Sequence, residues 1–499
     1  MIAKYHDIIR RLLKITANPE ENMLYDILII GAGITGSMLA RELSRYELKV
    51  AVLDKENDIA NGATMANSAI VHTGYDPVDG TLKAELNVKG ARKYPKICED
   101  LHCHIKNTGA FVVACSEEEE KFLDVLAERA VCREIPHEFL SGDDAHAVEP
   151  NLSDNITKVL SFPTTSVIYP WEVAIACMQV AVGNGVELFL NHEVSSVEKN
   201  DDGYSVTANG KPFHTKVLLN ASGIGASEIC HMVTEDAGFE ITPRRGEYYV
   251  ISNDEHIVNN IIFPVPTAKG KGVLAIPTVY GNTLIGPNSE QLEDKITTAT
   301  STGGARYLRE NIAKILKTVP LHKSIRTFAG LRPSSTSKDF IIGTLDDENP
   351  NFINIASIES PGLASAPAIA DYVIEHFIAD RFCLKENPDA VMTRDKPIVV
   401  SELSEEEREK LVRANSQYAN IVCRCETISE GEIVSAIHEV CGARSVKGIK
   451  KRVRPGMGKC QGGFCEPKVV EILARELDCS PVDIVQDGQY SKILERENR

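Results

Sequence analysis

The chain has 499 residues, of which 43% are hydrophobic, and a formal net charge of -17 at pH 7. This length suffices for two or three domains that each bury a core, and the acidic balance argues against a nucleic-acid partner, because phosphate binding requires clustered Lys and Arg. The sequence has neither an apolar run long enough to cross a membrane nor the apolar core and cleavage site of a signal peptide, so we expect a cytoplasmic protein.

Residues 1–24 are predicted to form a helical extension. Apolar residues recur there at helical spacing among Lys and Arg side chains: Ile8, Ile9, Leu12, Leu13 and Ile15. Docking of this short helix on the protein's own surface is favoured over membrane association, because the helix offers few apolar anchors.

A dinucleotide-binding turn is predicted at the start of the next domain. A buried strand over 25–30 and a helix over 37–43 are separated by three spaced glycines: Gly31, Gly33 and Gly36. The first glycine permits the tight turn, the second lets a pyrophosphate approach the backbone, and the third lets the helix pack on the strand. Strand, glycines and helix in this order indicate a Rossmann-like unit.

An acidic residue completes the dinucleotide turn, and two later segments specify which dinucleotide binds. A second strand over 49–53 ends in Asp54, whose carboxylate is expected to accept the ribose hydroxyls. A strand over 218–220 leads into small residues around Gly223, which suit close approach of the adenine half of a cofactor. Gly362 and Leu363 lead into a helix of small residues over 364–370, whose N-terminus suits the negative charge of a reduced flavin ring. Their order along the chain favours FAD over NAD.

The remaining pattern up to residue 384 predicts a mixed α/β fold. Short strands alternate with helices, which is typical of a parallel sheet with crossover connections. In the middle of the chain the predicted strands follow one another directly, with a hairpin around Gly281 and Asn282; they cover 186–190, 194–199, 203–208, 216–220, 273–277 and 283–286. We therefore expect an antiparallel region inserted into a parallel α/β domain. Residues 385–419, charged and helical in part, are predicted to be a linker.

The C-terminal segment carries a predicted metal site. Five of the 13 cysteines gather there, which favours a metal site over the disulfide framework of a small secreted protein. Four of them form two close pairs, C-x-C and C-x4-C: Cys423 with Cys425, and Cys460 with Cys465. Such pairs suit a [2Fe-2S] cluster or a structural zinc, and the spacing and neighbouring glycines favour iron. Cys441 is expected in a core, and Ser429 with Glu432 is expected to cap a helix over 430–440.

Five short motifs in register are similar to segments of the FAD-dependent D-amino-acid-oxidase-like superfamily. They span 67–75, 80–84, 243–249, 330–333 and 359–363. Within the superfamily, the chain most resembles the flavin-dependent glycerol-3-phosphate dehydrogenases and oxidases and the L-2-hydroxyglutarate dehydrogenases. The resemblance covers roughly 25–380, and it implies a Rossmann-like FAD-binding domain with an inserted antiparallel-sheet substrate domain, together spanning 25–384. We expect the FAD part at about 25–98, 150–225 and 325–380, and the substrate part at about 99–149 and 226–324.

Residues 420–499 resemble the bacterioferritin-associated-ferredoxin-like [2Fe-2S] domain, which implies a small, mainly helical fold. An iron-sulfur domain fused to a flavin domain suggests that electrons pass singly to the cluster and on to another protein, which favours a dehydrogenase over an oxidase. The anaerobic type of glycerol-3-phosphate dehydrogenase carries such a domain. The resemblance therefore implies an electron-accepting partner subunit, and peripheral membrane association through that partner remains an alternative.

Oxidising a secondary alcohol with a flavin requires a base for the hydroxyl proton and a cationic clamp for the anionic end of the substrate. By the resemblance, Asn67 and Ser68 contact the flavin ring, and His72, in the segment that passes its reactive face, is the candidate base. Arg332 is the candidate clamp, since its planar fork holds a carboxylate or phosphate in bidentate fashion.

The other basic residues give less specific predictions. Lys269 and Lys271 precede the predicted hairpin and are candidates to close over a phosphate, although a solvated role fits them equally. Between Arg244 and Arg245 the sequence does not choose. The basic run 447–454 suits docking of a partner or plain solvation.

The leading hypothesis is oxidation of sn-glycerol 3-phosphate to dihydroxyacetone phosphate, with a hydride moving from C2 to the flavin and the hydroxyl proton to His72. A 2-hydroxy acid such as L-2-hydroxyglutarate is the second candidate substrate, because it also presents an anion beside a secondary alcohol. A third hypothesis is an electron-transfer flavoprotein subunit without its own substrate, in which His72 and Arg332 would be dispensable.

Overall fold

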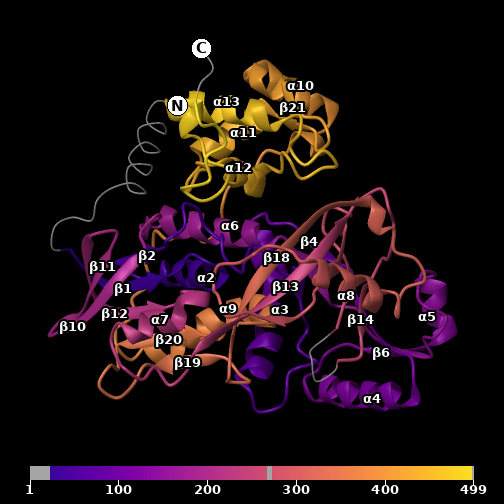
Figure 1. Ribbon diagram of the computed structural model, residues 1–499. Helices are drawn as coiled ribbons and strands as arrows, with labels where there is room; N and C mark the ends of the chain where they lie inside the picture. Colours follow the sequence, from indigo (N-terminus) through magenta and orange to yellow (C-terminus); the bar gives the residue numbers. More distant parts are fainter. Residues whose placement is uncertain (1–22, 267–271, 497–499) are drawn as a thin grey trace.

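A computed structural model describes residues 23–266 and 272–496. Figure 1 shows a larger body, built on two β-sheets, and a small helical domain above it that contains the C-terminal segment. The predicted N-terminal helix and both Lys269 and Lys271 lie outside the described residues. Within the described ranges, no helix combines the length and the apolar character needed to cross a lipid bilayer.

The first sheet has eight strands and a parallel centre. Strands β12, β1, β2 and β9 lie side by side in that order, and β20 runs parallel to the C-terminal half of β12. Strands β11 and β10 extend the sheet as an antiparallel ribbon from the N-terminal half of β12, and β19 pairs with β20. The bounds are β1 Leu24–Ile30, β2 Val50–Leu53, β9 Glu187–Phe189, β10 Val194–Asn200, β11 Gly203–Ala208, β12 Lys211–Asn220, β19 Ile341–Thr344 and β20 Phe352–Ala356.

The centre of this sheet is buried on both faces. In β1, Ile27 and Ile29 belong to one hydrophobic core with helices α2, α3, α6 and α9, while Leu28 and Ile30 belong to a second core that includes α7. Such a continuous apolar run is typical of a parallel strand covered on both sides. The helices are α2 Ile34–Leu43, α3 Leu82–Asp100, α6 Pro170–Gly183, α7 Ala226–His231 and α9 Gly362–Val373.

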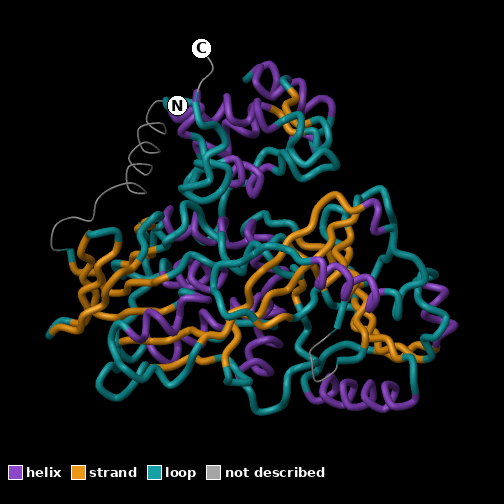
Figure 2. Tube along the Cα trace, viewed as in Figure 1, coloured by secondary structure: helices purple, strands orange, loops and turns teal. Residues whose placement is uncertain are grey.

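The second sheet has nine strands and forms the other half of the larger body (Figure 2). In the described ranges its strand pairs are antiparallel, except for β5 with β14. Its longest strands, β13 and β18, pair along their whole length. The bounds are β5 Ala110–Ala114, β6 Glu138–Ser141, β7 Lys158–Phe162, β13 Ile241–Ile251, β14 Ile261–Pro264, β15 Leu274–Pro277, β16 Thr283–Gly286, β17 Glu290–Gln291 and β18 Ser324–Ser335, with helices α4 Glu117–Cys132, α5 Gly142–Val148 and α8 Thr302–Ile312.

A three-stranded sheet joins the two halves. It consists of β3 Ile70–Val71, β8 Ser166–Ile168 and β4 Ile105–Asn107, in the order β3, β8, β4. The segment that contains the predicted flavin contacts and His72 runs through β3. This segment therefore lies at the junction of the two larger sheets.

The strand pairing differs from the expected division of residues 25–384 into an FAD part and a substrate part. The region 150–225 was assigned to the FAD part, yet β7 pairs with β5 and β6 in the nine-stranded sheet, and β18 belongs there as well. Conversely, the strands predicted at 194–199, 203–208 and 216–220 exist but join the first sheet, because the buried run at the end of β12 fits beside β1. The hairpin predicted at Gly281 and Asn282 connects β15 to β16.

The C-terminal domain is mainly helical, as predicted. The expected linker, 385–419, contains a helix of its own, α10 Glu405–Ala414. The domain then comprises β21 Ile421–Cys423, β22 Ile428–Ser429, α11 Glu430–His438, α12 Val446–Val453 and α13 Glu466–Leu477. The predicted capping box of Ser429 and Glu432 is present at α11. Cys441 is buried, but it packs in the core shared by α2, α3, α6 and α9 and so lies where the two bodies meet.

Candidate active site and cluster site

The glycine turn joins β1 to α2 in the predicted order. Gly31 has a φ of 106°, and a Cβ on it would lie 2.4 Å from the carbonyl oxygen of Ala221. A Cβ on Gly36 would lie 1.9 Å from the carbonyl oxygen of Gly31. The N-cap residue, Gly33, has no side chain that fills the helix N-terminus. The turn therefore leaves its backbone open to a phosphate group.

Asp54 supports the turn from the end of β2. Its carboxylate accepts the backbone N–H of Ala32 at 2.6 Å and that of Glu56 at 2.8 Å. Burial raises the pKa of this carboxyl to about 6. Each carboxylate oxygen has a second lone pair, so its predicted role as an acceptor for ribose hydroxyls is compatible with both bonds.

Two more backbone segments approach the same side of the first sheet. Gly223 has a φ of 60° and opens a short 3-10 turn after β12. Gly362 and Leu363 begin α9, whose N-terminus has no side-chain cap. A Cβ on Gly90 would lie 2.3 Å from the carbonyl oxygen of Ala364, so α3 holds α9 by close packing. The uncapped helix end is thus fixed in place and suits a negatively charged group.

One face of the ribbon formed by β13 and β18 carries the predicted clamp. The cross-strand register pairs Arg244 with Arg332, Gly246 with Gly330 and Tyr248 with Phe328. Directly opposite residues, and residues two apart along a strand, share one face of a sheet. This face therefore presents two guanidinium groups, two glycines and an aromatic pair whose rings stack at 4.7 Å.

The glycines of this face allow close approach. A Cβ on Gly330 would lie 1.9 Å from the carbonyl oxygen of Ala66, which precedes the predicted flavin contacts. A Cβ on Gly246 would lie 2.4 Å from Nη2 of Arg332. The Arg332 guanidinium thus lies across Gly246, where Nη2 donates to the carbonyl oxygen of Asn288 at 3.2 Å. Pairing of β18 with β13 fixes the backbone of Arg332.

The predicted flavin-contact segment lies against this face. Ser68 Oγ is 3.0 Å from the hydroxyl of Tyr248. Asn67 is engaged within its own loop, since its amide donates to the carbonyl oxygens of Ala63 and Thr64 and its Oδ1 accepts the N–H of Ala69. The structure thus gives Asn67 a loop-shaping role that the sequence did not predict. Tyr248 is a site candidate that only the strand register reveals.

His72 follows β3 at the junction of the sheets. It is 9% exposed, and its ring packs against Phe263 of β14 with centroids 5.7 Å apart. Its carbonyl oxygen accepts the side-chain amide of Asn87, on α3, at 2.6 Å. The imidazole is therefore held in a largely buried position four residues beyond Ser68.

An ion pair lies between the clamp face and the N-terminus of α9. Lys83 Nζ is 3.1 Å from Glu359, and the second carboxylate oxygen of Glu359 accepts the hydroxyl of Ser334 at 2.5 Å. Burial opposes ionisation of Glu359, but Lys83, Ser334 and the charge of Arg244 together hold its pKa below the ordinary value. Lys83 belongs to the 80–84 motif, yet its role could not be assigned without the fold.

Arg245 points to the opposite face of β13. Its guanidinium donates to the carbonyl oxygen of Ala299 and pairs with Glu290, both at 2.7 Å. Of the two arginines between which the sequence did not choose, Arg244 is thus the one beside Arg332. Lys269 lies outside the described residues, so its phosphate contact stays a prediction.

The four paired cysteines form two thiol contacts in the C-terminal domain. Cys425 Sγ lies 3.7 Å from Cys460 Sγ, and the thiol of Cys465 hydrogen-bonds that of Cys423. That bond, together with nearby backbone N–H groups, lowers the pKa of Cys423 to about 6 against the effect of burial. Cys423 and Cys465 are buried, Cys425 is exposed, and Cys460 is half-buried.

The surroundings of the thiols fit an iron-sulfur cluster. Backbone N–H groups donate to all four thiols: Gly456 to Cys423 and Cys465, Cys460 to Cys425, and Gly462 and Phe464 to Cys460. Such donors favour thiolates, the form that binds iron. In the part of the chain that the structure describes, no three His, Cys, Asp or Glu side chains converge as they would on a single metal ion. Two pairs suit a [2Fe-2S] cluster, in which each iron takes two protein ligands.

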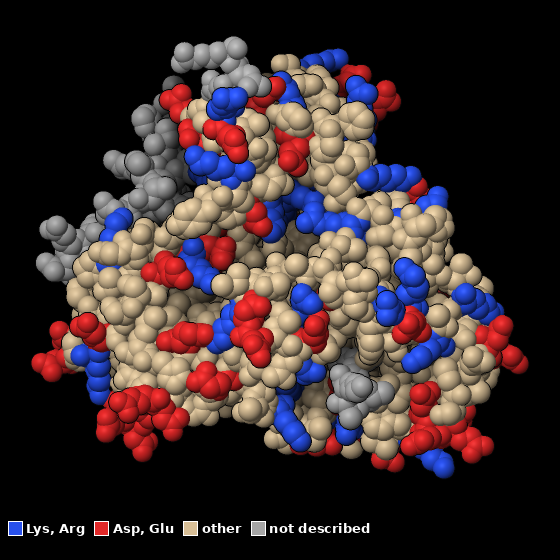
Figure 3. Space-filling model, in the orientation of Figure 1, with Lys and Arg blue, Asp and Glu red and all other residues tan. Residues whose placement is uncertain are grey.

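The loop around these thiols contacts the larger body beside the flavin-contact segment. Arg454, at the end of α12, pairs with Glu426 at 2.7 Å and stacks over the ring of Tyr280 at 3.4 Å. It also contacts the hydroxyl of Tyr169, which directly follows β8. Figure 3 shows Lys and Arg side chains in the recess beneath the C-terminal domain. The predicted flavin and cluster regions are therefore joined by direct contacts.

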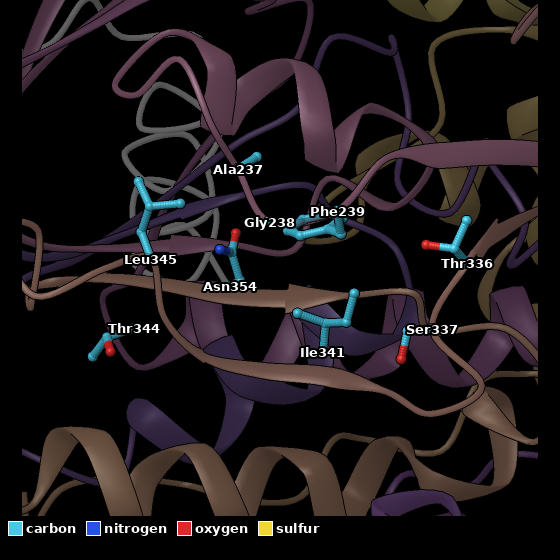
Figure 4. Close-up of a pocket in the computed structure, with 9 residues that line it drawn as sticks. All are labelled: Ala237, Gly238, Phe239, Thr336, Ser337, Ile341, Thr344, Leu345 and Asn354. Carbon is cyan, nitrogen blue, oxygen red and sulfur yellow. The ribbon is translucent and has the colours of Figure 1, made fainter.

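A cavity of about 430 Å³ lies elsewhere, over β19 and β20 (Figure 4). It is lined by Ala237, Gly238, Phe239, Thr336, Ser337, Ile341, Thr344, Leu345 and Asn354. None of these side chains titrates near neutral pH, and the Asn354 oxygen already accepts from Asn220 at 3.0 Å. We assign it no chemistry.

Comparison with known families gives two matches. A family described as FAD dependent oxidoreductase matches residues 26–376, and one described as BFD-like [2Fe-2S] binding domain matches residues 421–475. The two matches coincide with the predicted flavin region and with the cysteine pairs.

Similar proteins include dehydrogenases and oxidases. The chain is 45% identical over 475 residues to a glycerol 3-phosphate dehydrogenase of Caloramator mitchellensis, covering 94% of this chain and 98% of the relative. It is 33% identical to a glycerol 3-phosphate oxidase of Mycoplasma genitalium, covering 70% of this chain and 94% of the relative. The solved L-alpha-glycerophosphate oxidase of Mycoplasma pneumoniae with FAD bound superimposes with a TM-score of 0.72 at 29% identity, covering 76% of this chain and all of that one.

Proposed function

Because this chain belongs to the FAD-dependent oxidoreductase family, we propose that it oxidises sn-glycerol 3-phosphate to dihydroxyacetone phosphate and passes the electrons through its [2Fe-2S] domain to a partner protein. The observation that carries this proposal is the cross-strand pair of Arg244 and Arg332, on the face that also contacts Ser68 through Tyr248. The name and the 45% identity of the Caloramator mitchellensis relative support the same substrate.

The arginine pair suits a phosphate group. A guanidinium carries five N–H donors, and of those on Arg332 one is used by the carbonyl oxygen of Asn288. Arg244 likewise uses one donor, since its Nη2 donates to Ser289 Oγ at 2.8 Å. The remaining donors of both arginines are available to phosphate oxygens as charge-assisted hydrogen bonds. Lys83 is neutralised by Glu359, which leaves the arginines as the net positive charge of this face. Lys269 is proposed as a further phosphate contact.

His72 is proposed to take the proton of the substrate C2 hydroxyl. FAD, when bound, supplies the hydride acceptor. The Asn87 bond to its carbonyl oxygen and the Phe263 contact hold His72 in one orientation. Burial of the imidazole also keeps bulk water from competing for the proton. Gly31, Gly33, Gly36, Asp54 and Gly223 are proposed to bind the adenosine and pyrophosphate, and Ser68, Asn67, Gly362 and Leu363 to line the flavin ring.

The cluster site is proposed to hand electrons outward. A [2Fe-2S] cluster, when bound, carries one electron at a time. Cys423 and Cys465 anchor its buried side, whereas Cys425 and Cys460 hold the side that solvent reaches. This difference in exposure suits delivery to an electron-accepting protein at the Cys425 side.

The test is an anaerobic titration of purified holoenzyme, followed by its flavin absorbance. Glycerol 3-phosphate is expected to bleach the flavin, whereas L-2-hydroxyglutarate and unphosphorylated glycerol are not. Bleaching by L-2-hydroxyglutarate alone would contradict the substrate assignment. Bleaching by none of the hydroxy compounds would favour a subunit that is reduced by a partner.

The role of His72 has its own test. His72→Gln is expected to slow flavin reduction by glycerol 3-phosphate by about 100-fold or more while FAD content stays that of the wild type. An unchanged rate of bleaching would remove His72 as the base.

A further inference from the structure

Helix α12 of the C-terminal domain makes a buried ionic contact with the larger body. Asp58, in the loop after β2, pairs with both terminal nitrogens of Arg452 at 2.9 Å and with Lys451 Nζ at 2.9 Å. The three side chains are 6%, 3% and 2% exposed. Glu439 lies 3.3 Å from Nε of Arg452 and balances the second positive charge. The mechanism proposed above uses none of these groups.

The same helix also holds the neighbouring backbone. Lys451 Nζ donates to the carbonyl oxygen of Ile59 at 2.5 Å and to Oδ1 of Asn61 at 2.7 Å. A Cβ on Gly448 would lie only 3.2 Å from the carboxylate of Asp58, so the helix itself lies close to the loop. In Figure 1, α12 is the helix of the C-terminal domain that lies nearest the larger body, above α6. Residues 58–61 are thus fixed by a helix far away in the sequence.

This loop in turn contacts the glycine turn. The N–H of Ala60 donates to the carbonyl oxygen of Ala32 at 3.0 Å. Three residues after Asn61, the hydroxyl of Thr64 accepts the N–H of Ile34 at 2.9 Å. Both Ala32 and Ile34 flank Gly33, where the pyrophosphate is expected. Ion pairs and hydrogen bonds thus hold the backbone of 58–64 on one side to α12 and on the other to the dinucleotide turn.

We propose that α12 braces the FAD-binding turn, so that Lys451 and Arg452 are positioning residues for FAD although they belong to the [2Fe-2S] domain. The inference rests on the proposed assignment of the glycine turn to FAD, and it is independent of the substrate. Removing one member of the ionic group leaves a buried charge without its partner, which drives the loop to rearrange toward water. The turn then loses its contacts at Ala32 and Ile34, and FAD dissociates more readily.

The inference is tested by titrating deflavinated full-length protein with FAD and measuring its dissociation constant by flavin fluorescence. The single variants Asp58→Asn and Arg452→Gln are each expected to weaken FAD binding at least ten-fold while the iron content per chain is retained. The double variant Asp58→Asn with Lys451→Met leaves Arg452 paired with Glu439, so it is expected to bind FAD more tightly than Asp58→Asn alone. Arg413→Gln, which breaks only the exposed pair with Glu409 on α10, serves as the matched control and is expected to change nothing.

Asn61→Ala provides a milder variant if the ionic ones do not fold, because it removes a single acceptor of Lys451. It is expected to weaken FAD binding by a few-fold and to increase amide hydrogen exchange selectively at 57–64. FAD affinity within two-fold of wild type in folded, iron-containing variants would overturn the inference, as would a uniform rise in exchange across the whole chain. Because no substrate is present, neither result depends on whether glycerol 3-phosphate is oxidised.

Discussion

The two cofactor regions of this molecule are built in different ways. The proposed cluster site uses four thiols from two short segments of one domain, and its backbone donors come from the same loops. The proposed FAD site combines the glycine turn, the end of β12, the start of α9 and a loop that α12 holds from the other domain. A site made of a few strong ligands loses its cofactor when one ligand is removed. A site made of many backbone contacts loses affinity gradually as single contacts are removed. The exception is a closely packed position, where even one added atom displaces the backbone.

The largest effect is expected at the cluster. Cys423→Ser replaces a thiolate ligand of lowered pKa with a hydroxyl that stays protonated, so iron and labile sulfide should fall to background in purified protein. Iron and sulfide analysis measures this directly. Cys479→Ser, in the same domain but outside both pairs, should retain them, and a full iron content in Cys423→Ser would contradict the ligand assignment.

Gly36 is such a closely packed position in the proposed FAD-binding turn. Its Cβ would lie 1.9 Å from the carbonyl oxygen of Gly31, so Gly36→Ala must displace either the turn or α2. We expect purified Gly36→Ala to contain less than about a tenth of the wild-type FAD, as measured by flavin absorbance after denaturation. Gly62→Ala, where a Cβ meets nothing within 4 Å, should keep its FAD. Equal FAD in both variants would show that the turn does not need this close packing.

A graded loss is expected at the substrate clamp. Arg332→Gln removes charge-assisted hydrogen bonds worth about 1.5 to 3 kcal/mol, so KM for glycerol 3-phosphate should rise by roughly 10- to 150-fold. Steady-state kinetics with an artificial electron acceptor measures the change, with FAD content unaltered. Arg326 lies on the same face of β18 but six residues from Arg332, where its guanidinium contacts Gln461 at 3.4 Å, so KM of Arg326→Gln should stay near the wild-type value. The same KM increase in both variants would contradict the clamp.

The smallest expected effect is a pH dependence set by Asp54. Burial raises its pKa to about 6 in the FAD-free chain, so the folded state binds this proton more tightly than the unfolded state does. The contribution of Asp54 to the free energy of unfolding of the FAD-free chain is therefore greatest at low pH and falls as pH rises toward 6. FAD affinity depends on pH in the opposite direction and increases as pH rises, because the ribose hydroxyls donate to the ionised carboxylate.

FAD affinity should accordingly tighten between pH 5 and about 6, by at most roughly ten-fold per unit, and level off above that. Fluorescence titrations of deflavinated protein across this range measure the slope. Asp54→Asn should abolish the slope, and a slope that survives the substitution would assign it to another group.

Local patterns predicted the parts of both sites that depend on residues close together in the chain. The glycine turn and the capping box at Ser429 each occupy a few consecutive residues, and the structure builds both as expected. The cysteine pairs are equally local in the sequence, and the fold brings Cys425 of one pair beside Cys460 of the other. The family matches confirm the mixed α/β fold, the FAD-binding region and the [2Fe-2S] domain.

The features that the sequence did not predict depend on contacts between segments far apart in the chain. Strand register alone places Arg244 rather than Arg245 beside Arg332, and it alone brings Tyr248 to Ser68. The membership of β7 in the nine-stranded sheet follows from its pairing with β5, which composition does not encode. The pairing of Asp58 with Arg452 crosses a domain boundary. Asp58 belongs to no motif, and Arg452 lies in the basic run 447–454, for which the sequence suggested docking of a partner or solvation and not this buried pair.

The most direct test of the central claim, that flavin and cluster form one relay from glycerol 3-phosphate, is an anaerobic rapid-mixing experiment on the holoenzyme. Flavin absorbance and the electron paramagnetic resonance signal of the reduced cluster are recorded after a single addition of substrate. We predict that the flavin bleaches first and that the reduced-cluster signal then rises within the same turnover. A flavin that bleaches while the cluster stays oxidised, or a flavin that never bleaches, would contradict the account.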